Sequence, residues 1–108
     1  MPDAPDVPQI DIDELERRLE AGAPLIDVRQ PDEYEDFHVP GARLVPLGEV
    51  PDRLDEIPSD ETVYLICGSG GRSARAVQFL NARGYDAVNV GGGSKAWAAS
   101  GRPVDRGG

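Results

Sequence analysis

The sequence predicts an α/β fold, in which a central parallel sheet of about five strands is flanked by helices on both faces, giving three layers. Three observations support this prediction. Strand-like apolar segments alternate with helical patterns along the chain. The segment 62–67, TVYLIC, is almost wholly apolar and rich in β-branched or aromatic residues, and a glycine-rich turn follows it directly. The length of 108 residues fits one compact domain.

The first part of the chain is expected to form a tail, a helix and a strand. Residues 1–9 contain three prolines, which predicts a flexible tail. The next residues carry helix signals, because Asp11 can cap the first turn and Glu14 follows it at capping-box spacing. Gly22 should end this helix. The apolar residues at 24–29 then have the length of a strand.

Three shorter segments follow. Residues 31–37 open with a proline and acidic residues, as the first turn of a short helix does. Residues 38–47 are expected to be extended, interrupted by a Pro-Gly pair. Residues 48–57 are expected to form another short helix, which Pro58 closes.

The last part of the chain completes the alternation. After the strand at 62–67, apolar residues recur at helical spacing over 72–84. The segment 86–90 is expected to be the last strand, and the segment 94–101 a terminal helix. Trp97 should pack this helix onto the sheet.

Composition excludes several classes of function. Twenty acidic residues against eleven basic ones give a formal charge of -9, which argues against nucleic acids and anionic membranes as partners. No apolar run approaches the roughly 20 residues that span a bilayer, and the N-terminus lacks the pattern of a signal peptide. We therefore expect a cytoplasmic protein, with a monomer as the default state. One cysteine and one histidine provide neither a disulfide nor a usual metal site.

The single cysteine, Cys67, ends the strongest predicted strand and precedes the loop GSGGRS. In parallel sheets, ligands bind beyond the carboxyl ends of the strands. Glycines allow successive backbone N–H groups to converge, the following helix adds unpaired donors, and Arg72 adds a positive charge. This anion cradle should lower the pKa of the thiol and so make it nucleophilic. A lone cysteine is more often a packing residue, but the coincidence of these features favours chemistry.

Three motifs follow one another along the chain, LIDVRQPDEYEDFHVPGARLVPL, CGSGGRS and VNVGGGSKAW. In this order they resemble the motifs of single-domain rhodanese-like sulfurtransferases. The resemblance covers residues 10–104 and leaves 1–9 and 105–108 as tails. The resemblance implies that Cys67 takes a sulfane sulfur from thiosulfate or a persulfide donor and passes the persulfide sulfur to a thiol, cyanide or protein acceptor, without a cofactor. The implied persulfide-binding loop consists of Gly68, Ser69, Gly70, Gly71, Arg72 and Ser73.

The resemblance also implies roles outside the loop. Asp27 and Arg29 should lie near the loop and brace it, joined by Glu33. His38 is expected to be structural, since it belongs to the turn HVPGA. Gly68 stands where active thiosulfate enzymes often carry a bulky or basic side chain, which leaves Arg72 as the only charge in the loop. This departure favours a protein persulfide donor.

Three other functions compete with sulfur transfer. Related phosphatases and arsenate reductases have five residues between cysteine and arginine, whereas four separate Cys67 from Arg72. The segment VNVGGGSKA formally matches a dinucleotide-binding fingerprint, but no further βαβ unit follows it, so a tight turn is the better interpretation. A rhodanese-like module that binds a partner without turnover remains the main alternative. The reactivity of Cys67 would discriminate it from an enzyme.

Overall fold

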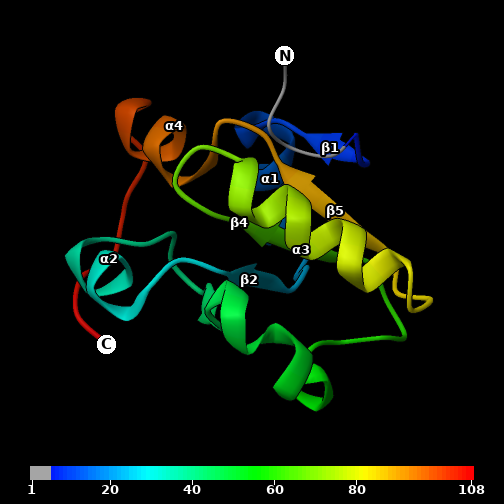
Figure 1. The fold of residues 1–108 in the computed structure, drawn as a ribbon. Helices are drawn as coiled ribbons and strands as arrows, with labels where there is room; N and C mark the ends of the chain where they lie inside the picture. Colours follow the sequence, from blue (N-terminus) through cyan, green and yellow to red (C-terminus); the bar gives the residue numbers. More distant parts are fainter. Residues whose placement is uncertain (1–5) are drawn as a thin grey trace.

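The computed structural model describes residues 6–108, so that residues 1–5 of the predicted tail lie outside the described residues. The chain forms a sheet with helices packed around it (Figure 1). The elements in chain order are β1 (Gln9–Ile10), α1 (Ile12–Glu20), β2 (Leu25–Asp27), α2 (Pro31–Asp36), β3 (Arg43–Leu44), η1 (Leu47–Asp52), η2 (Leu54–Glu56), β4 (Val63–Ile66), α3 (Gly71–Asn81), β5 (Ala87–Val90) and α4 (Gly93–Ala99).

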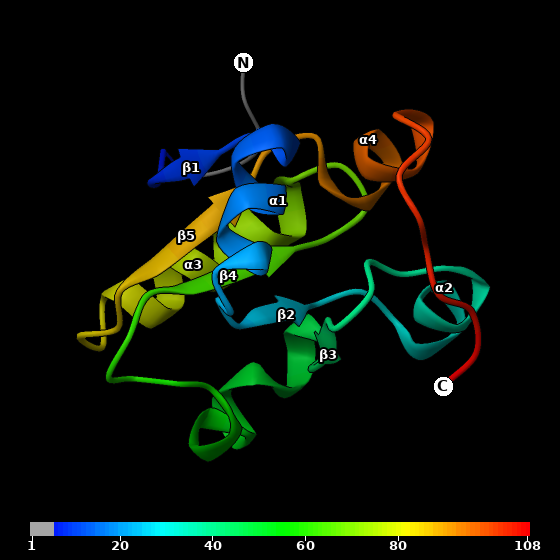
Figure 2. The same cartoon turned by 180° about the vertical axis from the view of Figure 1, so that it is seen from behind.

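The five strands form one sheet in the order β1-β5-β4-β2-β3, and every neighbouring pair is parallel. This confirms the predicted α/β fold. Strand β4 is central, with β2 on one side and β5 on the other. Helix α3 covers one face, and α1 covers the other, as the two opposite views show (Figures 1 and 2).

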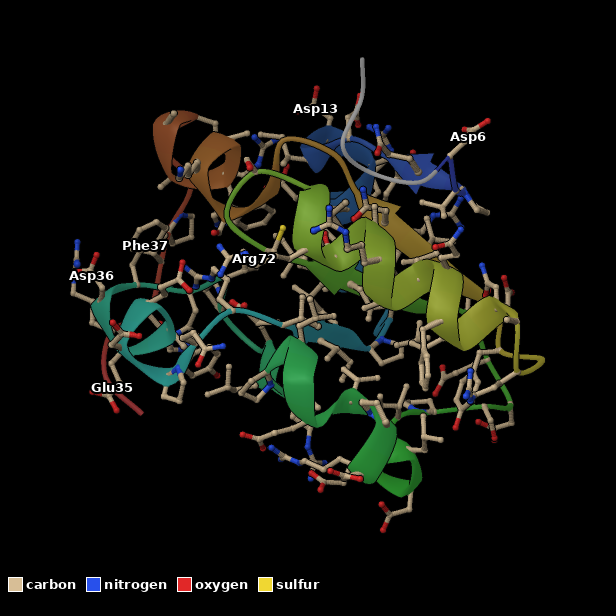
Figure 3. All side chains as sticks on the ribbon, in the orientation of Figure 1. Asp6, Asp13, Glu35, Asp36, Phe37 and Arg72 are labelled. Atoms are coloured by element: carbon tan, nitrogen blue, oxygen red, sulfur yellow. The ribbon has the colours of Figure 1, made fainter. Side chains whose placement is uncertain are left out.

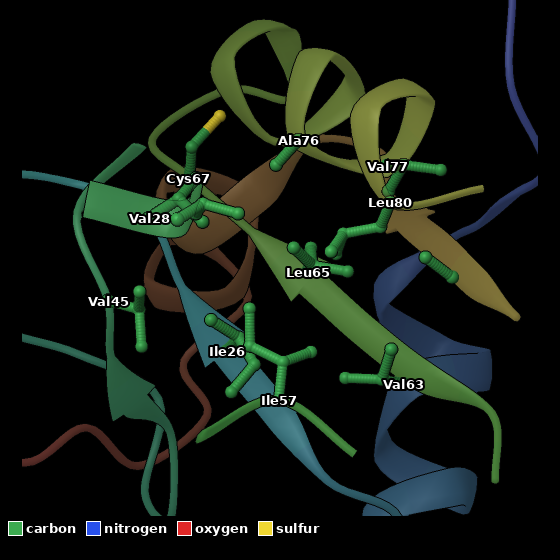
Figure 4. Packing of buried hydrophobic residues seen from close by; sticks show 12 residues of the cluster. Ile26, Val28, Val45, Ile57, Val63, Leu65, Cys67, Ala76, Val77 and Leu80 are labelled. Atoms are coloured by element: carbon green, nitrogen blue, oxygen red, sulfur yellow. The ribbon is translucent and has the colours of Figure 1, made fainter. Parts of the chain in front are cut away.

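The core divides into two clusters because side chains alternate between the faces of a strand. Val63, Leu65 and Cys67 belong to the cluster on the α3 face, which Figure 4 shows. Tyr64 and Ile66 belong to the cluster on the other face. All residues of β4 are buried, which explains why its sequence is continuously apolar.

Two local predictions, the cap of α1 and the packing of α4, are confirmed. Asp11 caps α1, and its side-chain oxygen accepts a hydrogen bond from the Glu14 N–H at 2.9 Å. Trp97 is 4% exposed within the second core cluster, and its indole N–H donates to the Pro103 carbonyl at 2.8 Å. Trp97 therefore packs α4 against the body of the domain, as predicted.

Some local features differ from the prediction. The short helix expected at 48–57 takes the form of two 3₁₀ helices, η1 and η2, with Pro51 inside the first. A proline without an N–H cannot extend an α-helix there. The sheet begins at Gln9, one residue inside the predicted N-terminal tail, because Gln9 pairs with Asn89. At the other end, Asp105 pairs with His38 through two backbone hydrogen bonds of 2.9 Å.

None of the helices formed by residues 6–108 has the length and apolar character that crossing a membrane requires.

Candidate active site

Cys67 lies just beyond the carboxyl end of the central strand β4. It follows Val63 and Leu65 at a spacing of two residues, so that its side chain points to the α3 face of the sheet (Figure 4). Residue Cys67 is only 1% exposed. The alternation along the strand therefore directs the thiol toward the loop that begins α3.

The loop after Cys67 turns back over its sulfur. The Gly70 N–H donates to Cys67 Sγ at 3.1 Å, and the Ser73 hydroxyl lies 3.3 Å from the same atom. Gly70 precedes α3 with a φ of +114°, a conformation that residues with a Cβ rarely adopt. The predicted loop thus brings Cys67, Gly70 and Ser73 together. Arg72 pairs with Glu33 and also interacts with the Cys67 side chain, and Ser69 is exposed.

The surroundings of Cys67 act on its pKa in opposite directions, with a net decrease. Burial raises the pKa of the thiol, because it disfavours the charged form. Hydrogen bonds from the Ser73 hydroxyl and from the backbone N–H groups of Ser73, Gly70 and Ser69 stabilise the thiolate and lower the pKa below its ordinary value. The thiolate is the form of cysteine that attacks sulfur.

Asn89 completes the site, although the sequence analysis did not identify it. It lies on β5 beside Leu65 and shares the face of Cys67. It is 1% exposed, and its side-chain amide donates to the carbonyl of Gly70 at 3.2 Å and to Gln9 Oε1 at 2.8 Å. Its Oδ1 accepts from the Ser73 hydroxyl. A polar residue within an otherwise apolar strand was the signal available in the sequence.

The Ser73 hydroxyl has one proton and three possible hydrogen-bond acceptors. Asn89 Oδ1 is 2.5 Å away, Cys67 Sγ is 3.3 Å away, and the Gly70 carbonyl is 3.3 Å away. A hydroxyl donates one hydrogen bond at a time. Ser73 can therefore turn its proton toward the sulfur when the thiolate forms.

A second glycine turn, between β5 and α4, holds the loop from the outside. The Ser94 N–H donates to the Cys67 carbonyl at 2.8 Å, and the Lys95 N–H donates to the Gly68 carbonyl at 3.0 Å. This contact requires Gly93, because a β-carbon there would lie 2.4 Å from the Cys67 carbonyl oxygen. The VGGGSKA segment thus acts as a structural clamp.

Arg72, which is labelled in Figure 3, forms an ion pair with Glu33 of α2, with N–O distances of 2.7 and 3.0 Å. The Arg72 guanidinium is the largest influence on Glu33 and lowers the pKa of this carboxyl to about 2. Both side chains are partly exposed, at 38% and 36%. Glu33 therefore contacts the only arginine of the loop, and its role as a bracing residue stays a prediction.

Asp27 and Arg29 form a buried ion pair, with 0% and 3% of their side chains exposed. Arg29 donates to both carboxylate oxygens of Asp27 and to the carbonyl of Phe37. These hydrogen bonds connect the end of β2 to the segment after α2, and do not include the Cys67 loop. Asp27 and Arg29 thus hold the end of α2, the helix that carries Glu33. Any bracing of the Cys67 loop by this pair would act indirectly through Glu33, and it stays a prediction.

His38 lies outside the cradle. Its ring stacks on Tyr34 with centroids 3.6 Å apart, and its Nδ1 lies 2.7 Å from the Tyr34 carbonyl oxygen. These contacts agree with the structural role expected for it.

Within residues 6–108, no group of three or more His, Cys, Asp or Glu residues is placed to hold a metal ion. A surface hollow of about 230 Å³, lined in part by Gly22 and Thr62, lies at the opposite ends of the strands.

The fold and the site together define an α/β domain with a glycine-rich loop that folds over a cysteine at the end of its central strand. The chain belongs to the family of rhodanese-like domains, whose family model matches residues 11–100. It is similar to a sulfurtransferase of Allochromatium vinosum, with 39% identity over 91% of this chain and 94% of the relative.

Two further proteins are similar to this chain. The chain is 46% identical to the uncharacterized protein YqhL of Bacillus subtilis over 69% of its own length, and the match spans 60% of that relative. The crystal structure of a rhodanese-like domain protein from Staphylococcus aureus superposes with a TM-score of 0.84 and 35% identity. That match covers 94% of this chain and 100% of the other.

Proposed function

We propose that this protein is a sulfurtransferase that carries a sulfane sulfur as a persulfide on Cys67. The observation that carries the proposal is the position of Cys67 Sγ, which accepts hydrogen bonds from Gly70 and Ser73 beyond the central strand. Membership of the rhodanese-like family and the similarity to a protein named sulfurtransferase support it.

In the first step, the Cys67 thiolate attacks the outer sulfur of a donor such as thiosulfate. A bond forms between the two sulfurs, the bond from the outer sulfur to the sulfonate breaks, and its electron pair leaves with sulfite. One thiolate and one dianion thus yield one persulfide anion and one dianion, so charge is conserved. The lowered pKa of Cys67 favours this step, because it raises the share of thiolate at neutral pH.

In the second step, an acceptor attacks the terminal sulfur of the persulfide. Cyanide would leave as thiocyanate and regenerate the Cys67 thiolate, and a cellular thiol would leave as a new persulfide. The backbone N–H groups of the loop, from Gly68 to Ser73, would hold the persulfide anion between the two steps. No proton donor is required when the acceptor is an anion.

The test is the intact mass of the reduced protein after incubation with thiosulfate, beside Cys67→Ser. Because Cys67 is the single cysteine of the chain, a gain in mass of one sulfur atom would be assigned to Cys67. We expect the gain in the wild type alone, with cyanide removing it. Cys67→Ser should fold normally, since it exchanges one buried atom, and should lose all transfer activity.

Two results would change the proposal. Loading from a persulfide donor but not from thiosulfate would restrict the donor and keep the mechanism. Loading from neither donor would contradict sulfur transfer and would favour the alternative of a rhodanese-like binding module.

A further inference from the structure

Lys95 is the only lysine among the eleven basic residues of the chain, and the fold places it at the Cys67 loop. It lies in the first turn of α4, 28 residues beyond Cys67 in the sequence, and its N–H donates to the Gly68 carbonyl at 3.0 Å. Its side chain is exposed. The clamp described above therefore also brings a second cation to the loop.

The Lys95 and Arg72 side chains flank the same point. A β-carbon built on Gly68 would lie 3.2 Å from Arg72 Nη2 and 3.6 Å from Lys95 Cε. A side chain at position 68 would thus press against both side chains. Because Gly68 has none, Arg72 and Lys95 both approach this position.

The two cations differ in their partners. Arg72 is held by Glu33 through two hydrogen bonds. Lys95 forms no ion pair with an acidic side chain in the described part of the chain, whereas several arginines, such as Arg53 and Arg102, are paired with carboxylates. Lys95 is therefore a cation beside Gly68 of the Cys67 loop, and within the described residues no acidic side chain pairs with it.

The overall charge of the protein makes such a cation consequential. A formal charge of -9 repels small dianions, and a local positive charge raises their concentration at the surface where it lies. The loop itself has no basic residue at position 68, and its arginine is already paired with a carboxylate. An anionic donor approaching Cys67 therefore meets Lys95 as the uncompensated positive charge.

We propose that Lys95 is a donor-binding residue, which draws an anionic sulfur donor to Cys67. This inference rests on the proposed function and specifies its substrate class as anionic donors. It changes the expectation that Arg72 is the only charge at the loop. The ammonium acts through its charge alone, and no proton moves to or from it in the sulfur-transfer step.

The first test separates charge attraction from thiol reactivity, and it does not require sulfur transfer. Iodoacetate is an anion and iodoacetamide is neutral, and both alkylate the single cysteine. Lys95→Gln should lower the rate of alkylation by iodoacetate about fivefold, the order expected for one charge at close range in water. The rate with iodoacetamide should stay unchanged. Lys95→Arg should keep the wild-type ratio of the two rates.

The matched control is Arg83→Gln, which removes the same charge beyond the far end of α3 and should leave the ratio unchanged. A ratio that is equal in wild type and Lys95→Gln would overturn the inference. Equal slowing with both reagents would also overturn it, because Lys95 would then act on the thiol itself. A wild-type thiol that reacts with neither reagent would exclude both this inference and the proposed function.

The second test uses steady-state transfer from thiosulfate. Lys95→Gln should raise KM several-fold with little change in kcat, and the difference from wild type should shrink as salt screens the charge. If the wild type transfers sulfur and Lys95→Gln has the same KM, the inference fails while the proposed function stands. If no donor loads the wild type but the alkylation ratio still falls in Lys95→Gln, the proposed function fails while anion attraction by Lys95 stands.

Discussion

The two glycine-rich turns after β4 and β5 are alike in local structure and different in what their backbone donors bind. Each turn has a glycine with positive φ immediately before its helix, Gly70 at +114° and Gly92 at +81°, and neither helix has a side-chain cap. In the first turn, N–H groups lie over the sulfur of Cys67. In the second turn, the N–H groups of Ser94 and Lys95 bind carbonyls of the first turn.

This difference shows that a glycine turn becomes an anion cradle only when its donors remain available. The β5–α4 turn formally matches a dinucleotide-binding fingerprint in sequence, yet the N–H groups of Ser94 and Lys95 bind carbonyls of the neighbouring loop. The β4–α3 turn keeps donors for Cys67 because the other turn and Glu33 hold it in place from outside. One turn is thus the site, and the other is its support.

The largest expected effect is on the clamp. Gly93→Ala should destabilise the protein by about 3 kcal/mol or more, because it combines a positive φ with a clash and the loss of hydrogen bonds to Cys67 and Gly68. Urea unfolding would measure this. The matched control is Gly71→Ala, where a β-carbon has no atom within 4 Å, and the free energy of unfolding should stay within about 1 kcal/mol of wild type. Similar losses in both variants would contradict the clamp.

An intermediate effect should separate the two turns through their serines. Ser73→Ala removes a donor to the Cys67 sulfur, so the pKa of the thiol should rise and the pH profile of alkylation by iodoacetamide should move to higher pH. Ser94 is also fully buried, but its hydroxyl donates to the Cys67 carbonyl. Ser94→Ala should cost about 1 kcal/mol of stability and leave the profile in place. An equal shift of the pH profile in both variants would contradict the inference that only the β4–α3 turn acts on the thiol.

The smallest effect is expected at the ion pair between Arg72 and Glu33. Glu33→Gln should lower the free energy of unfolding at neutral pH by about 0.2–1 kcal/mol, because the pair is partly exposed. The pKa of Glu33 is depressed from 4.5 to about 2, so the pair stabilises the fold above pH 4.5 and loses its contribution as pH falls toward 2.

Denaturant titrations of wild type and Glu33→Gln, at neutral pH and near the depressed pKa of Glu33, would test this dependence. The two proteins should differ at neutral pH and converge in acid. A difference that is the same at both pH values would show that the carboxylate charge does not brace the loop.

Local patterns predicted much of the fold and the centre of the site. Asp11 caps α1 through a residue three positions away, and the apolar run of β4 is continuous in the sequence, so both signals are visible in a short window. Cys67 could be identified in the same way, because the strand, the glycines and the helix start are contiguous. Ser73 follows them within the same loop.

The remaining residues of the site come from distant parts of the chain. Asn89 reaches Ser73 only because β5 pairs with β4, and Glu33 reaches Arg72 across 39 residues. The contacts of Asp27 and Arg29 also depended on tertiary structure, which directs Arg29 to Asp27 and the Phe37 carbonyl and not to the loop.

By itself, the sequence determined the alternation of strands and helices, the position of the thiol and its glycine loop, since each depends on residues adjacent in the chain. The tertiary structure decided which groups surround that loop. Strand order brings β5 beside β4, and with it Asn89, the Gly93 clamp and Lys95. Strand pairing depends on hydrogen bonds between segments far apart in the chain and on the burial of both faces of the sheet. A short window of sequence therefore does not reveal it.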